Sequence, residues 1–154
     1  MTPGIERASG WVRVAAEALW RTLVVLAGLH LYWLLGGTWG LHAASGGAYS
    51  DVTTGLRIQS ALMVVLLVGA ALVVRARAGL VRAPFSARVV RIAMWVLTAL
   101  LGLTALANVA AATNCERYGI GPFVFVLALL ALTVAAPGTD WRRIRRPHRT
   151  QPSH

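Results

Sequence analysis

Four long apolar runs alternate with short polar segments along the chain. The runs occupy about residues 19–38, 58–74, 92–112 and 120–136. Each is close to the ~20 residues that a helix needs to cross a hydrocarbon core of ~30 Å. The runs are continuous rather than alternating, so they favour helices over the strands of a membrane β-barrel. The pattern predicts an all-α fold, a bundle of four transmembrane helices arranged as two hairpins.

The polar segments divide this bundle in a simple way. Residues 1–17 are mixed and predict a short interfacial helix, residues 37–56 a loop rich in Gly, Ser and Thr, and residues 75–91 a basic loop. Residues 1–138 therefore form a single transmembrane domain. Residues 139–154 are rich in Arg and broken by Pro, which predicts a basic cytoplasmic tail without fixed structure.

Composition supports the membrane class. The chain of 154 residues is 57% hydrophobic and 13% charged. Soluble domains are about a quarter charged, so this chain lacks the charge to cover a soluble surface. We therefore expect the lipid bilayer to be its main surroundings.

The arginines predict an orientation. The formal net charge is +10 and every Lys or Arg position is Arg. Thirteen of the fifteen arginines lie in the N-terminal segment, the middle loop and the tail, against Arg57 and Arg117 on the other side. The positive-inside rule then places both termini in the cytoplasm. No nucleic-acid-binding motif accompanies the charge, so we expect no nucleic acid partner and instead anionic lipid at the Arg142–Arg149 tail.

A signal peptide is the alternative interpretation of the first run. It has a basic start, an apolar stretch over residues 22–35 and small residues at 43–45. His30 and the aromatic pair Tyr32 and Trp33 are atypical of such a stretch, so we favour a retained span.

One polar site is predicted inside the membrane, at His30 with Tyr32, Trp33 and Asn108. An ionisable residue in a span is a functional-site candidate by default. A neutral imidazole still needs hydrogen-bond partners, and the neighbouring spans offer Asn108, Thr104, Thr98, Gln59 and Ser60. We favour a structural role, in which His30 bonds across the bundle with Asn108 as a candidate partner, over a site for a quinone, a haem or a lipid.

The chemistry available to the chain is narrow. His30 is the one histidine within a span, so bis-histidine haem has no second ligand, and no metal site is predicted. The single cysteine, Cys115, excludes a disulfide within the chain and a thiolate cluster. No nucleophile–base pair or carboxylate dyad is present. We therefore predict no catalytic residues, no cofactor and, more readily than an enzyme, a non-enzymatic protein.

The first span leaves the membrane through Gly36, Gly37 and Trp39, a candidate outer mouth. Paired glycines permit close approach and left-handed backbone. We favour a helix exit that folds the loop back over the bundle, and a ligand pocket under the aromatic residues is the alternative.

Two motifs resemble an uncharacterised bacterial family of small four-span membrane proteins, grouped as a domain of unknown function. They are His30-x-Tyr32-Trp33-x-x-Gly36-Gly37-x-Trp39-Gly40 and, later, Cys115-Glu116-Arg117 before Pro122. Here Cys115 stands where the family usually has Trp, and no Pro follows Trp39. The resemblance covers roughly residues 28–136. It implies a four-helix integral protein of the bacterial inner (plasma) membrane and brings no known activity.

These observations favour one function over another. The first is a non-enzymatic accessory or structural membrane subunit, with a membrane protein partner or as a homo-oligomer. The alternative is a membrane binding protein or enzyme with a His30-centred site for a quinone, haem or lipid.

Overall fold

The computed structural model describes residues 3–45, 47, 49–82, 85–111 and 114–136, with side chains from residue 10 onward. In these ranges every regular element is helical. The elements are α1 (Pro3–Leu34), α2 (Leu41–Ala44), α3 (Thr54–Arg77), α4 (Ala87–Val109), the π-helical turn η1 (Glu116–Ile120) and α5 (Gly121–Ala135). The predicted tail at 139–154 lies outside the described residues.

Four helical segments are long and apolar enough to cross a membrane. They are Gly10–Leu34, Thr54–Arg77, Ala87–Val109 and Glu116–Ala135. The predicted all-α class with four membrane-spanning helices is therefore confirmed, and the chain has the structure of a multi-pass membrane protein.

α1 differs from the prediction at both ends. The expected interfacial helix and the first span form one continuous helix from Pro3, because no residue between them breaks the hydrogen-bond ladder. At the other end α1 stops at Leu34, whereas the span was expected to continue to Thr38. Gly36 has a left-handed φ of 101°. The Gly36 N–H donates to the Trp33 carbonyl, and the Gly37 N–H donates to the Tyr32 carbonyl. This pair of bonds is a Schellman motif, which ends a helix at a left-handed glycine.

Hydroxyl side chains cap the starts of α3 and α4. The Thr53 hydroxyl accepts a hydrogen bond from the N–H of Leu56 at the start of α3. Ser86 does the same for Val89 at the start of α4, which begins five residues before the predicted span at residue 92. Each hydroxyl satisfies an N–H that has no partner within the helix.

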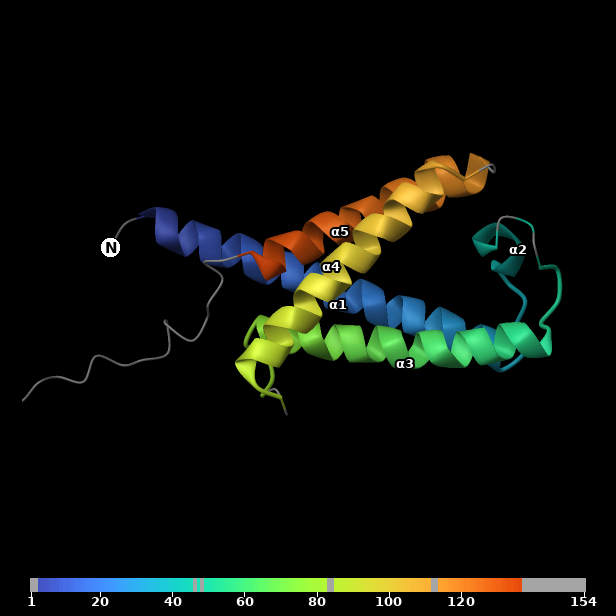
Figure 1. Cartoon of the computed structure of the whole chain (residues 1–154), viewed down its shortest axis with the longest axis horizontal. Helices are drawn as coiled ribbons and strands as arrows, with labels where there is room; N and C mark the ends of the chain where they lie inside the picture. Colours follow the sequence, from blue (N-terminus) through green and yellow to red (C-terminus); the bar gives the residue numbers. More distant parts are fainter. Residues whose placement is uncertain (1–2, 46, 48, 83–84, 112–113, 137–154) are drawn as a thin grey trace, which may run out of the picture.

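The spans pair as two antiparallel hairpins, α1 with α3 and α4 with α5 (Figure 1). We call the end where residues 78–86 join α3 to α4 the arginine end. The opposite end, where residues 35–53 join α1 to α3, is the loop end. The hairpins cross, and toward the loop end α4 and α5 diverge from α1 and α3 (Figure 1).

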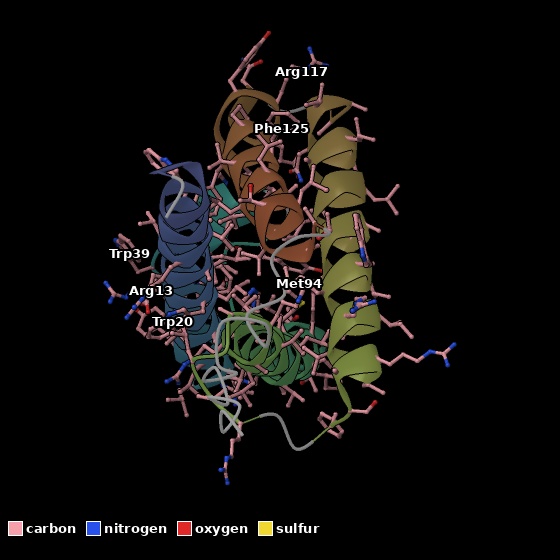
Figure 2. The ribbon with its side chains drawn as sticks, turned by 90° about the vertical axis from the view of Figure 1, so that its left-hand side faces the viewer. Arg13, Trp20, Trp39, Met94, Arg117 and Phe125 are labelled. Atoms are coloured by element: carbon pink, nitrogen blue, oxygen red, sulfur yellow. The ribbon has the colours of Figure 1, made fainter. Side chains whose placement is uncertain are left out.

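The main core lies toward the arginine end. Met94 of α4 is fully buried near the middle of the four helices, seen from that end in Figure 2. Small residues of α5 allow the hairpins to approach closely, since Ala128, Ala131 and Ala135 are all buried. The buried residues of this core are Ala15, Ala16, Leu19, Leu23, Ala71, Val74, Ala78, Met94, Leu127, Ala131, Val134 and Ala135.

Met94→Ala is expected to destabilise the bundle, because it leaves a cavity where the two hairpins meet. The expected loss is ~2–5 kcal/mol of unfolding free energy. Reversible unfolding in mixed detergent micelles measures it. The control is Val96→Ala, on the exposed side of the same helix. Equal effects of the two substitutions would show that Met94 is not part of the core that joins the hairpins.

Candidate intramembrane polar site

His30 lies on α1 and is half-buried. Its ring meets Trp33, one turn later, edge-to-face, with 4.9 Å between ring centroids and 83° between ring planes. The Nδ1 atom is buried and has no hydrogen-bond partner among the described residues. A polar atom without a partner in the hydrocarbon region costs free energy, so this nitrogen marks a place where a hydrogen-bonding group would be stabilised.

The predicted partners on α4 do not reach His30. The Asn108 amide donates to the Thr104 carbonyl at 2.8 Å. The hydroxyls of Thr98 and Thr104 donate to the carbonyls four residues before them, at 2.9 and 2.8 Å. The expected hydrogen bond between His30 and Asn108 is therefore not formed. The physical reason is the helix pairing, because α4 packs mainly on α5 and α3.

Asn108 instead marks the close contact of α4 with α5. A Cβ atom placed on Gly121 would lie 3.4 Å from the Asn108 Cβ and 3.1 Å from the Glu116 carbonyl oxygen. Asn108 and His30 thus belong to different hairpins, and the structure does not bring them together.

Ser60 of α3 is the candidate partner of His30 that lies in the interior of the first hairpin. It is fully buried, and its hydroxyl has no hydrogen-bond partner among the described residues. Trp33 and Leu56 share one apolar cluster, so they fix the register of α1 against α3. One turn further from the loop end, the antiparallel helices present His30 and Ser60 in the same layer of their interface. Gln59, the other predicted partner on this span, is exposed.

Sequence reasoning named Ser60 only as one of several partners for His30. The helical periodicity of buried residues along α3 would have distinguished Ser60 from the other candidates. Ser60 lies four residues after Leu56, on the stripe that continues through Leu67, Ala71 and Val74 and packs toward α1. A hydroxyl on an otherwise apolar inner stripe is the feature that distinguishes it from the exposed Gln59.

Trp33 contacts both His30 and the residues at the loop end. It is buried with Leu41 of α2 and Leu56 of α3. Its indole Nε1 donates to the Trp39 carbonyl at 3.0 Å. These contacts fold the loop back over the end of the α1–α3 hairpin, which is the arrangement we favoured for the Gly-rich exit.

The residues of the candidate outer mouth have separate roles. Gly36 supplies the left-handed turn, and Gly37 lies directly against the ring of Tyr32, where a Cβ atom would clash. The Trp39 side chain is 77% exposed, so it does not cover a pocket, although its carbonyl holds Trp33. Tyr32 thus packs against the exit turn, and Trp33 alone of the two contacts His30.

α2 also reaches the second hairpin. The Cys115 thiol donates to the Ala43 carbonyl at 3.4 Å, which links α2 to the turn between α4 and α5. At this turn the Arg117 guanidinium donates to the Ala111 carbonyl at 3.0 Å. Figure 1 shows α2 lying beside the diverging end of α4 and α5.

The described residues contain no group of three His, Cys, Asp or Glu side chains close enough to hold a metal ion. His30 offers a single nitrogen beside one hydroxyl and one indole. This set suits a hydrogen bond to an oxygen atom better than coordination of a metal, which needs several ligands.

Together these features define a four-span integral membrane protein with a small polar layer inside its first hairpin. The chain belongs to the family described as "Protein of unknown function (DUF3995)", whose model matches residues 23–130. This match confirms the resemblance to an uncharacterised family, and it covers His30, Ser60 and Asn108. No curated protein and no solved structure matches the chain significantly.

Gly37→Ala is expected to destabilise the protein by ~1–3 kcal/mol, because the added methyl group overlaps the Tyr32 ring. In a Tyr32→Ala background most of this loss should disappear, which a double-mutant cycle in detergent would measure. Gly28→Ala is the control, since a Cβ at Gly28 meets nothing within 4 Å. If Gly37→Ala destabilises the protein equally in the absence of the Tyr32 ring, the contact between Gly37 and Tyr32 is not the cause of the loss.

Proposed function

We propose that this chain is a non-enzymatic accessory or structural subunit of the bacterial inner membrane. The observation that carries the proposal is the divergence of the two hairpins. α4 and α5 share a core with α1 and α3 toward the arginine end and separate from them toward the loop end. Helices associate in a bilayer through packing, so separated faces are where a partner's helix gains most contact.

The side chains of the diverging part fit this role. Large apolar residues of α4 and α5 near the loop end are exposed, namely Leu103, Leu106, Val109, Phe123, Phe125 and Val126.

The proposed orientation has both termini in the cytoplasm. The described arginines near the arginine end are Arg13, Arg21, Arg75, Arg77, Arg82, Arg88 and Arg91. Near the loop end stand only Arg57 and Arg117 among the described arginines. This asymmetry between the two ends supports a cytoplasmic arginine end through the positive-inside rule.

The native Cys115 tests the orientation directly. It is exposed at the loop end, so a membrane-impermeant maleimide should label it in intact spheroplasts. In a Cys115→Ser background, a cysteine in place of Arg88 should be labelled only after permeabilisation. The reverse labelling pattern would mean that the arginine end faces outward.

Purification in a mild detergent followed by native mass spectrometry tests the subunit proposal. We expect one fixed stoichiometry with a second membrane protein or with further copies of this chain. A photo-cross-linking residue in place of Phe125 should capture that partner, whereas one in place of Leu66, on an exposed face of α3, should not. A monomer that cross-links only to lipid would overturn the proposal.

A second function is favoured by the unpartnered His30 Nδ1 and Ser60 hydroxyl. We propose that this layer hydrogen-bonds one oxygen atom of a lipid-soluble ligand, for which a quinone carbonyl fits better than haem. The imidazole or the hydroxyl would donate the hydrogen bond, and Trp33 would pack against the ligand ring. A single histidine supplies one axial ligand, so haem gains less from this set of groups.

This second function predicts that His30→Ala and Ser60→Ala each deplete a ligand from the purified protein without unfolding it. Solvent extraction, chromatography and an absorption spectrum measure the ligand. Gln59→Ala, next to Ser60 but exposed, is the matched control. If His30→Ala unfolds the protein and no ligand is found in the unaltered chain, His30 serves only to hold the helices together.

A further inference from the structure

A second polar cluster lies at the arginine end, outside the site described above. Two guanidinium groups gather around the indole ring of Trp20. The Arg75 Cζ lies 5.0 Å from the ring centroid and that of Arg21 5.6 Å, both within the range of a cation–π interaction. Arg75 comes from α3 and the other two residues from α1, so the cluster bridges the first hairpin.

One carboxylate is present in this cluster, and it is already engaged. Glu17 accepts a hydrogen bond from the Trp20 Nε1 at 2.9 Å and forms an ion pair with Arg21 at 3.2 Å. The two arginines and the glutamate leave a net charge of +1. Arg75 makes no ion pair with a described residue, and its Nε is buried without a hydrogen-bond partner. The terminal N–H groups of the Arg75 guanidinium likewise have no described hydrogen-bond partner, so they and its charge are available for an anion.

The position of Arg75 along α3 places it at the membrane surface. It follows Arg57 by eighteen positions, which corresponds to about 27 Å of helix. That is close to the ~30 Å of the hydrocarbon core, so the two arginines lie at the two headgroup levels. Trp side chains also favour this level.

Apolar side chains continue from the cluster into the membrane. Val24 lies one turn from Arg21 on α1, and Leu72 lies one turn before Arg75 on α3. Both are exposed and lie on the side of the cluster nearer the bilayer centre. A molecule with an anionic group at the cluster could therefore place an acyl chain along these residues.

We propose that Arg75 and Arg21, held around Trp20, bind the phosphate of an anionic phospholipid. The guanidinium groups donate charge-assisted hydrogen bonds to the phosphate oxygens. Glu17 positions Trp20 and Arg21 and limits the net charge of the cluster to +1. This site is built from the folded hairpin and is distinct from the basic tail after residue 138.

Titration of the full-length protein with phosphatidylglycerol, followed by native mass spectrometry, tests the site. Arg75→Gln should weaken binding more than tenfold, because a hydrogen bond to a charged group contributes ~1.5–3 kcal/mol. Arg88→Gln removes the same charge at an exposed position near the same end and should lose only the diffuse attraction, about fivefold at most. Equal losses from Arg75→Gln and Arg88→Gln would overturn the proposal in favour of diffuse attraction.

Further variants and ligands sharpen the result. Arg75→Lys keeps the charge but loses the planar guanidinium, and should also weaken binding, which covers the case in which Arg75→Gln fails to fold. Trp20→Leu should also weaken the binding of phosphatidylglycerol. Phosphatidylcholine and inorganic phosphate separate the possible sources of the anion. If inorganic phosphate binds as tightly as phosphatidylglycerol, or if phosphatidylcholine does, the site does not select an anionic lipid and the proposal is wrong.

Discussion

The antiparallel packing of α1 against α3 is the contact on which the rest of the structure depends. In a bilayer the hydrophobic effect does not hold helices together, so the fit of side chains across this interface has to do so. One register serves three layers. Leu56 shares an apolar cluster with Trp33 at the loop end, and Arg75 lies over the ring of Trp20 at the arginine end. Between them, the helical repeat places Ser60 level with His30.

The same register places the residues that attach the start of the α1–α3 loop to the hairpin. Gly36 ends α1 in a left-handed turn, and Leu41 returns α2 to the surface of the hairpin beside Trp33. The Trp33 indole holds the Trp39 carbonyl, which satisfies a polar group of the loop close to the membrane. A shift of one residue between α1 and α3 would separate Leu56 from Trp33. Leu41 of α2 would then lose the apolar cluster against which it packs.

The two proposed sites contrast in how their polar groups are satisfied. At the arginine end Glu17 bonds both Trp20 and Arg21, so the cluster is largely assembled before any lipid arrives. In the middle of the hairpin the His30 nitrogen and the Ser60 hydroxyl have no described partner, and the hydrocarbon surroundings make that costly. A preassembled surface site and an unsatisfied interior layer are expected to differ in ligand, which is why we assign a headgroup to the first and a carbonyl oxygen to the second.

Much of the architecture was already determined by the sequence itself. Continuous apolar runs of about twenty residues can satisfy their backbone in lipid only as helices, so class and number of spans followed from length and composition. The two ends of the first helix depended on individual residues rather than on hydropathy. Residues 3–17 joined the first helix because nothing interrupts it, and Gly36 ended that helix early through its left-handed backbone.

Only the tertiary structure decided which polar residues meet. The sequence offered His30 partners on two neighbouring spans, and hydropathy does not say which face of a helix turns toward which neighbour. Because α1 packs on α3, Ser60 entered the layer of His30, whereas Asn108 bonded within α4 and packed beside Gly121. The approach of Arg75 to Trp20 also depends on that pairing, since more than fifty positions separate them in the chain and only helix packing brings them to 5.0 Å.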